Sequence, residues 1–307
     1  MLRPSTTTRR VAIGLAVGAA AFTLGACGGS SSSGGSSASG SAAALPTVSA
    51  DATLASQVPA NIKSSGKLTF GTDASYAPNE FIAEDGSTIV GVDVDLGNAI
   101  AARLGLQGQW SNANFDSLIV GVTNGKYDSS MSSFTINPER EKQVNMISYF
   151  NAGTQWAVAK GNPENIAPDN ACGKKIGVQK ATVQVDDITA RSAVCTKAGK
   201  PAIDIQQYNL QSDVTTAVVS GKVDAMLADS PVVDYAVQQT GGKLQTLGDV
   251  YDSAPYGVVI PKSETAFAKT IQGAIQSLID DGSYQKILDK WGVGNGAIKT
   301  SEVNPAS

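Results

Sequence analysis

Apolar and polar residues follow two periodic patterns along this chain, one typical of strands and one typical of helices. Short runs such as Lys67–Thr72 and Lys175–Gln179 are typical of strands. Elsewhere apolar residues recur every fourth position, as Leu96 and Ile100 do on one face of a helix that Asp93 can cap. Together the two patterns predict a protein of the α/β class.

The same strand–helix order occurs in two parts of the chain. In the first part the pattern predicts strands at Lys67–Thr72, Gln109–Ser111 and Tyr127–Ser133, with helices from Asp93 and over Phe115–Val122. In the second it predicts strands at Lys175–Gln179, Ile203–Tyr208 and Asp224–Asp229, with helices over Val183–Lys197, Ser212–Val219 and Pro231–Gln239. Such alternation predicts two units, each with its own parallel sheet and helices on both faces.

The end of the chain is predicted to be helical, because Phe267, Ile271 and Ile275 form one apolar stripe suited to core packing. Two extended segments, Thr154–Lys160 and Tyr256–Pro261, are placed where the chain would leave the first unit and return to it. A double crossing of this kind acts as a hinge between two lobes.

The N-terminus has the organisation of an export signal: arginines at positions 3, 9 and 10, an apolar run to Leu24, and small residues before Cys27. Leu24–Cys27 resembles the lipobox of bacterial lipoproteins. That resemblance implies cleavage after residue 26, lipidation of Cys27 and a place on the outer face of the cytoplasmic membrane. An uncleaved membrane helix is the alternative, although the run is short of the ~20 residues that a span needs. Sec and twin-arginine export both stay open.

The segment after the lipobox and the charge of the chain agree with an anchored, exported protein. Gly28–Ala44 is almost wholly Gly, Ser and Ala, which is typical of a flexible tether. Loss of residues 1–26 removes three arginines and no acid, so 20 basic residues face 27 acidic ones and the net charge changes from −4 to −7. This acidity argues against nucleic acid as a partner and offers no basic surface to a membrane.

Candidate chemistry is limited by what the sequence lacks. It contains no histidine, the commonest general base and metal ligand, and the thiols form no metal-binding cluster. After lipidation of Cys27, Cys172 and Cys195 remain, and in an oxidising compartment two cysteines most simply pair. Two buried free thiols are the alternative. No metal or cofactor is expected.

Four motifs carry a resemblance to a known family, and they are Gly71–Phe81, Gly91–Leu96, Gly125–Arg140 and Asp224–Pro231. In order and spacing they resemble the substrate-binding proteins of bacterial polar amino-acid ABC importers. The resemblance implies a type II periplasmic-binding-protein fold: two lobes, each a sheet flanked by helices, joined by a two-strand hinge. It also implies an ABC permease with its ATPase as partners, and a monomer.

The predicted divisions of the chain are a signal peptide (1–26), a tether (27–53), a first lobe (54–154 and 255–300), a second lobe (155–254) and a tail (301–307).

An α-amino acid removed from water needs a partner for both of its charges. By the resemblance, Arg140 clamps the ligand α-carboxylate and Thr135 donates to it, while backbone groups near Ser133 and the carboxylate of Asp229 take the ammonium. The N–H groups at Thr182 and Val183 reach the carboxylate from the second lobe. The family usually has Gly-Thr-Thr here, whereas this chain has Ala181-Thr182-Val183.

The resemblance also assigns a side-chain pocket. Tyr76 and Phe115 are its aromatic walls, Ser132 faces it, and Asp73 and Gln179 touch the ligand side chain. An acid at position 73 favours amide or cationic side chains, so glutamine-like or basic amino acids are the expected ligands. Asn79 stands where the family commonly has Phe and is expected to widen or polarise the pocket.

Two other functions stay open at this point. Some relatives on this scaffold are enzymes that dehydrate small carboxylic acids, and Glu80 is the one spare acid near the cleft that we can name for such a step. Absence of histidine weighs against this, and we expect no enzyme. A tethered sensor that signals without transport is the other alternative.

Overall fold

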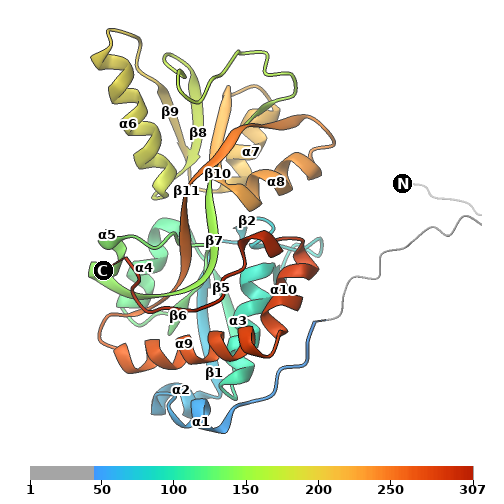
Figure 1. Ribbon diagram of the computed structural model, residues 1–307, viewed down its shortest axis with the longest axis vertical. Helices are drawn as coiled ribbons and strands as arrows, with labels where there is room; N and C mark the ends of the chain where they lie inside the picture. Colours follow the sequence, from blue (N-terminus) through green and yellow to red (C-terminus); the bar gives the residue numbers. More distant parts are fainter. Residues whose placement is uncertain (1–44, 307) are drawn as a thin grey trace, which may run out of the picture. The chain divides into compact units, whose positions relative to one another are not determined.

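The computed structural model describes residues 45–306, which are shown in colour in Figure 1. The predicted signal peptide, Cys27 and the tether up to residue 44 lie outside the described residues. None of the helices in residues 45–306 has the length and apolar character that are needed to cross a membrane.

Eight strands form one sheet in the order β5-β1-β6-β11-β7-β10-β8-β9. Their bounds are β1 Lys67–Thr72, β5 Gln107–Asn112, β6 Ser129–Ser130, β7 Val144–Ala159, β8 Lys175–Gln179, β9 Asp204–Tyr208, β10 Ala225–Asp229 and β11 Leu244–Pro261. A second, three-stranded sheet consists of β2 Ser75–Tyr76, β3 Glu80–Ile82 and β4 Ile89–Val90. The large sheet contains parallel pairs on either side of an antiparallel centre, β7 with β11.

The helices are α1 Ala52–Ser56, α2 Ala60–Ser65, α3 Val92–Arg103, α4 Phe115–Thr123, α5 Pro138–Gln143, α6 Val183–Lys197, α7 Gln211–Val219, α8 Ser230–Gln239, α9 Thr265–Asp280 and α10 Ser283–Trp291, followed by a 3-10 turn at Gly294–Gly296. The predicted strands and helices are all present, with shifts of a few residues at their ends. The predicted strand Tyr127–Ser133 is shorter, since only Ser129 and Ser130 pair as β6.

Two long strands connect the lobes. β7 has 16 residues and β11 has 18, and both run the length of the antiparallel pair. One half of the pair borders β6, and the other half borders β10. The predicted hinge segments are therefore only parts of longer strands, and the two half-sheets that we expected to be separate are joined into one. We call the part around β1, β5 and β6 the first lobe and the part around β8, β9 and β10 the second lobe (Figure 1).

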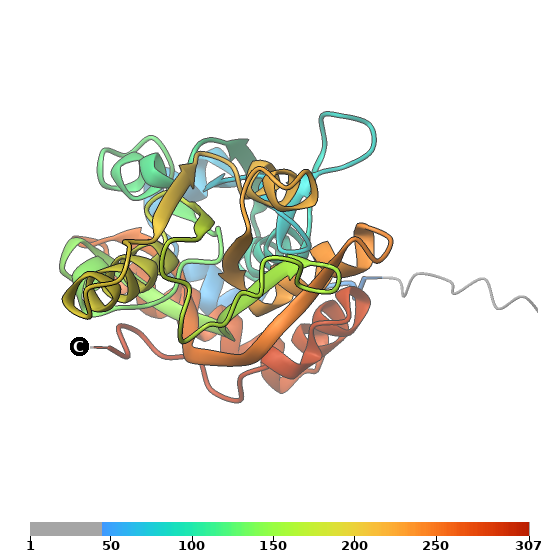
Figure 2. The same ribbon diagram turned by 90° about the horizontal axis from the view of Figure 1, so that it is seen from above.

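Each lobe buries its own core. In the first lobe, Leu68, Phe70 and Ile100 pack against the stripe of α9, whose Phe267 and Ile271 are buried as predicted. In the second lobe α6 covers one face of the strands, and α7 and α8 cover the other, as Figures 1 and 2 show. Cys172 and Cys195 form a disulfide that attaches α6 to the loop before β8, so the predicted pairing is confirmed.

The C-terminal tail pairs with the first lobe. Ser148 N donates to Glu302 O (2.9 Å), Met146 N donates to Asn304 Oδ1 (2.8 Å), and Ile147 bridges Val303. On this stretch β7 is thus bonded to β11 on one side and to the tail on the other. The tail leaves no free backbone edge there, which removes a place for unwanted strand pairing.

Candidate functional site

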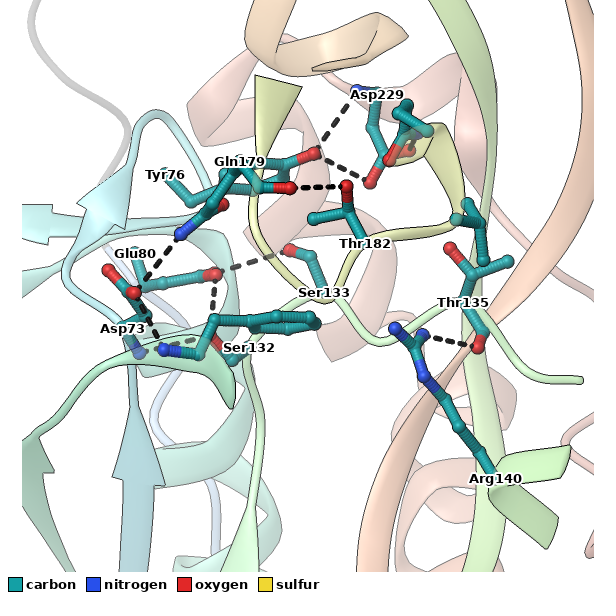
Figure 3. A pocket seen from close by; sticks show the side chains of 13 residues that line it. Asp73, Tyr76, Glu80, Ser132, Ser133, Thr135, Arg140, Gln179, Thr182 and Asp229 are labelled. Carbon is teal, nitrogen blue, oxygen red and sulfur yellow. Dashed lines mark hydrogen bonds between the residues drawn. The ribbon is translucent and has the colours of Figure 1, made fainter. Parts of the chain in front are cut away.

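A narrow cavity lies between the two lobes. Thirteen residues line it, eight from the first lobe and five from the second: Asp73, Tyr76, Glu80, Phe115, Ser132, Ser133, Thr135 and Arg140, then Gln179, Thr182, Val183, Gln184 and Asp229 (Figure 3). All eleven residues that the sequence suggested as ligand-binding are brought together here. Glu80 and Gln184 were not among them.

Arg140 is positioned by a short helix start. Asn137 Oδ1 accepts a hydrogen bond from Arg140 N (2.9 Å), and Pro138 occupies the first turn of α5. The guanidinium donates to Thr135 O (2.7 Å) and, across the cavity, to Ala181 O (3.0 Å). It lies over the rings of Phe115 and Phe134, 5.4 and 5.6 Å from their centroids. Burial lowers the pKa of Arg140 to about 10, so the side chain remains a cation at neutral pH.

The second lobe presents the start of α6 to the cavity. Thr182 precedes the helix, and its hydroxyl donates to Gln179 O (2.8 Å) instead of capping the first turn. The start of this 15-residue helix therefore lines the cavity, and no side chain caps its first turn. The turn before it has Ala181 at φ 61°, a left-handed conformation that glycine adopts without strain. Glycine is the residue that the resemblance led us to expect at this position.

Asp229 lies at the end of β10, where it is 5 % exposed. Its Oδ2 accepts from the hydroxyls of Tyr76 (3.0 Å) and Tyr256 (2.8 Å), and its Oδ1 accepts from Gln184 Nε2 (2.8 Å). Burial raises the pKa of Asp229, while the three hydrogen bonds and Arg140 oppose that rise. Tyr76 belongs to the first lobe, so its hydrogen bond spans the cavity. A carboxylate held in this way is a partner for a ligand ammonium.

Asp73 is 1 % exposed and lies after β1. Its Oδ1 accepts from Ser75 Oγ (2.7 Å), and its Oδ2 accepts from Phe115 N (2.9 Å) and from Gln179 Nε2 across the cavity (3.1 Å). Burial raises its pKa, and these hydrogen bonds oppose the rise. Asp73 and Gln179, both assigned to the ligand side chain, are thus in direct contact with each other.

Glu80 on β3 is fully buried and faces the same end of the cavity as Asp73 (Figure 3). Its two carboxylate oxygens accept from Ser132 Oγ (3.1 Å) and Ser133 Oγ (3.3 Å). Burial, and then the nearby Asp93, raise the pKa of Glu80 well above its ordinary value. Sequence reasoning named Glu80 only as a spare acid, although it lies within the same motif as Asp73 and Tyr76.

Asp93 and Asn79 stand behind this end of the cavity. Asp93 does not cap its helix as predicted, because Gly91 occupies the N-cap position and Asp93 turns into the protein. Its Oδ2 accepts from Ser133 N (2.9 Å) and Tyr149 OH (2.6 Å). Asn79 was expected to widen or polarise the pocket, but it is not among the lining residues. It donates to Ser133 Oγ (2.8 Å) instead.

The distribution of charge over the site is uneven. Among the lining residues Arg140 is the single cation, whereas Asp73, Glu80 and Asp229 are acids. In Figure 3 Asp73 and Glu80 lie on one side of the cavity, Arg140 and Thr135 on the other. No group of residues in the described part of the chain is arranged to hold a metal ion.

Residues 68–294 match the model of the bacterial extracellular solute-binding proteins, family 3. The chain belongs to this family. The identification confirms the resemblance that the four motifs suggested, and it agrees with the two-lobed α/β architecture.

Individual members of the family are similar to this chain over most of its length. The arginine-binding protein ArgT of Corynebacterium glutamicum is 34 % identical over 98 % of this chain and 97 % of its own. A solved ancestral arginine-binding protein bound to arginine is 32 % identical, with a TM-score of 0.68, and the match covers 74 % of this chain and 98 % of that one. An ancestral arginine-binding protein has also been solved bound to glutamine, and it is 31 % identical with the same TM-score and coverage.

Proposed function

We propose that this protein is the substrate-binding component of an ABC importer and that its ligand is an amino acid with a cationic side chain, of the arginine class. The single observation that carries the proposal is the charge layout of the cavity. One end holds the only lining cation, Arg140, and the other end holds Asp73 and Glu80, with Asp229 also facing the cavity. An α-amino acid with a second positive charge matches this layout.

In the proposed pose the ligand α-carboxylate lies between Arg140 and the start of α6. Guanidinium and helix-start N–H groups are both suited to a carboxylate. Arg140 would give up its hydrogen bond to Ala181 O or share it with the ligand, since both groups face the same space. The ammonium then lies against Asp229, whose position is held by the hydroxyls of Tyr76 and Tyr256.

The opposite end decides which amino acids bind. Asp73 and Glu80 are buried without a lysine or arginine among the residues hydrogen-bonded to them. A neutral amide brings no counter-charge to this acidic end, and a carboxylate adds a further negative charge. A guanidinium or ammonium group offers the opposite charge together with several N–H donors. We therefore narrow the expected ligand from glutamine-like or basic to basic.

Closure of the lobes is coupled to binding by contacts that cross the cavity. Arg140 to Ala181, Gln179 to Asp73 and Tyr76 to Asp229 each join one lobe to the other. A ligand that contacts both ends stabilises the same arrangement, and only such differential contacts shift the equilibrium towards the closed form. A permease that recognises the closed form would then accept the ligand.

The cellular setting is part of the same proposal. We infer that residues 1–26 are an export signal, that Cys27 carries lipid, and that 27–53 form the tether of a monomer that delivers its ligand to a permease and ATPase. The lobes are proposed to comprise 54–154 with 255–300, and 155–254. Mass spectrometry of the membrane-extracted protein should detect diacylglycerol on Cys27. A mature chain that begins elsewhere and carries no lipid would contradict this part.

Binding without chemical conversion is the function that we propose for the cavity. A dehydratase would need a carboxylic acid free to deliver a proton to its substrate. Both oxygens of Glu80 are held by the hydroxyls of Ser132 and Ser133, which favours a role in binding over one in proton delivery to a substrate. Incubation of the protein with arginine, followed by mass spectrometry, should return unchanged arginine. Turnover of any α-amino acid would contradict this assignment.

A thermal-shift and calorimetry panel tests the ligand assignment. The panel should contain arginine, lysine, ornithine, citrulline, glutamine and glutamate, since these differ mainly in side-chain charge. We expect arginine to bind most tightly, the neutral citrulline and glutamine more weakly, and glutamate not at all. If glutamine or glutamate binds more tightly than every cationic amino acid, the assignment is wrong. Uptake of labelled arginine by cells lacking the gene would then separate transport from sensing.

A further inference from the structure

Two buried acids lie next to each other at the side-chain end of the cavity, and only one of them lines it. Glu80 faces the cavity, and Asp93 on α3 lies directly behind Ser133. Ser133 connects them, because its hydroxyl donates to Glu80 Oε2 (3.3 Å) and its backbone N–H donates to Asp93 Oδ2 (2.9 Å). The two carboxyl groups also act on each other, because the nearby charge of Asp93 raises the pKa of Glu80.

The described residues that are hydrogen-bonded to this pair supply donors but no positive charge. Tyr149 on β7 donates to Asp93 (2.6 Å), and Ser132 donates to Glu80 (3.1 Å). The titratable groups that act on the pair from β1, β2 and β7 are Asp73, Tyr76 and Tyr149, none of which is a cation. Lys290 on the neighbouring α10 is bonded to Asp95 (2.6 Å), on another part of α3.

Two acids that are buried together without a cation cannot both be ionised at low cost. Such a pair titrates as a unit, and it keeps one proton to a higher pH than either acid would alone. Burial moves the pKa of Asp93 to about 6 and that of Glu80 also upwards, in agreement with the geometry. A cation brought to Glu80 has the opposite effect, since it favours the fully ionised pair.

We propose that Glu80 and Asp93 share one proton while no cation lies at this end, and that a cationic ligand side chain replaces that proton. Asp93 is then a specificity-determining residue that does not itself touch the ligand. The inference rests on the proposed function, because it needs a cationic ligand. The step balances in charge: the singly protonated pair binds the ligand cation, loses H⁺ to the buffer and becomes a doubly ionised pair.

The exchange makes binding depend on pH in a defined direction. Ligand and proton compete for the same pair, so affinity for arginine rises with pH and falls as the pair becomes protonated. Where one proton is released per ligand, the dissociation constant increases about tenfold for each unit by which pH falls. A neutral ligand such as citrulline does not displace the proton, so the affinity for citrulline should depend on pH much less.

Calorimetry in buffers of different ionisation enthalpy measures the released protons directly. At pH 6.0 and 7.0 we expect arginine binding to release a substantial part of one proton per ligand, and citrulline to release far less. Asp93→Asn should reduce the release with arginine at both pH values, because loss of the neighbouring charge lowers the pKa of Glu80. Tyr149→Phe removes a hydrogen-bond donor from Asp93, so the pKa of the pair should rise and proton release should extend to higher pH. This variant provides the test if Asp93→Asn does not fold.

A matched control is Asp128→Asn, which removes a carboxylate that is bonded to Thr69 in the same lobe but away from the cavity. It should leave proton release unchanged. The inference is overturned if arginine binds with a heat that is independent of the buffer, if citrulline releases as many protons as arginine, or if Asp93→Asn behaves as the unaltered protein does. If arginine does not bind at all, the proposed function fails and this inference fails with it.

Discussion

The two ends of the cavity differ in how their charges are balanced. At the Arg140 end a guanidinium, the start of α6 and the carboxylate of Asp229 provide both signs of charge. At the other end Asp73 and Glu80 provide only negative charge, with Asp93 behind them. The balanced end suits the part that all α-amino acids share. Under the proposed function a cationic ligand side chain completes the unbalanced end, and we expect this end to select the ligand.

Removal of Arg140 should have the largest effect, because it destroys the balanced end. Arg140→Ala leaves Asp229 and the acids without a fixed counter-charge and should weaken every amino acid by about 2–5 kcal/mol, roughly thirtyfold to several thousandfold. Isothermal titration calorimetry with arginine and glutamine measures this loss. Arg140→Lys keeps the charge but not the paired N–H donors of the guanidinium, so it should recover only part of the affinity. Unchanged binding by Arg140→Ala would refute the assignment.

The matching change at the unbalanced end is Glu80→Gln, and its effect should depend on the ligand. Loss of one charged partner should weaken arginine by about 1.5–3 kcal/mol, roughly ten- to a hundredfold. Glutamine should change much less, because it brings no charge to this end. The ratio of the two affinities is therefore the informative quantity. A parallel loss for both ligands would mean that Glu80 supports the fold and does not select.

A smaller effect is expected from the hydroxyl that holds Asp229 in place. Tyr256→Phe removes one hydrogen bond to Asp229 and should weaken all α-amino acids alike, by about 1 kcal/mol. Tyr284→Phe is the matched control, since its buried hydroxyl bonds to Tyr149 O (2.8 Å) and Ile298 N (3.0 Å) within the first lobe. The control should lower the melting temperature without changing affinity. Equal effects of both variants on affinity would argue against a positioning role for Tyr256.

The smallest change concerns the turn that faces Arg140 from the second lobe. Ala181 has φ 61°, where an L residue is strained by about 1 kcal/mol, so Ala181→Gly should raise the free energy of unfolding by roughly 0.5–1 kcal/mol. Ala198→Gly is the control, because Ala198 has φ −85° and should gain nothing. Urea denaturation measures both. Destabilisation by Ala181→Gly would show that the strain argument is wrong.

Sequence patterns predicted most of the fold because local periodicity determines most elements. The bounds of α6, Val183–Lys197, were predicted without error at both ends, since the change from strand to helix pattern is a local feature. The joined sheet and the docked tail were not predicted. Both depend on backbone pairing between distant segments, such as Ile147 with Val303, and such pairing has no local signature.

The site shows the same division. The residues carried by motifs were predicted and meet at one cavity, but Glu80 and Gln184 were missed, and Tyr256 was not connected with Asp229. Glu80 was named only as a spare acid for an enzymatic step, because no local feature shows that it is buried and bonded to Ser132 and Ser133. Asp93 was misread as a helix cap, because position at a helix start is the usual reason for an aspartate there. Gly91 takes that position instead.

A crystal structure of the protein with arginine, grown at pH 7.5, tests the proposed orientation of the ligand most directly. We predict that the ligand α-carboxylate is bonded to Arg140, its ammonium to Asp229, and its guanidinium lies against Glu80. A ligand bound in the reverse direction, or with its guanidinium pointing away from Glu80, would contradict the central claim that the unbalanced end selects a cation.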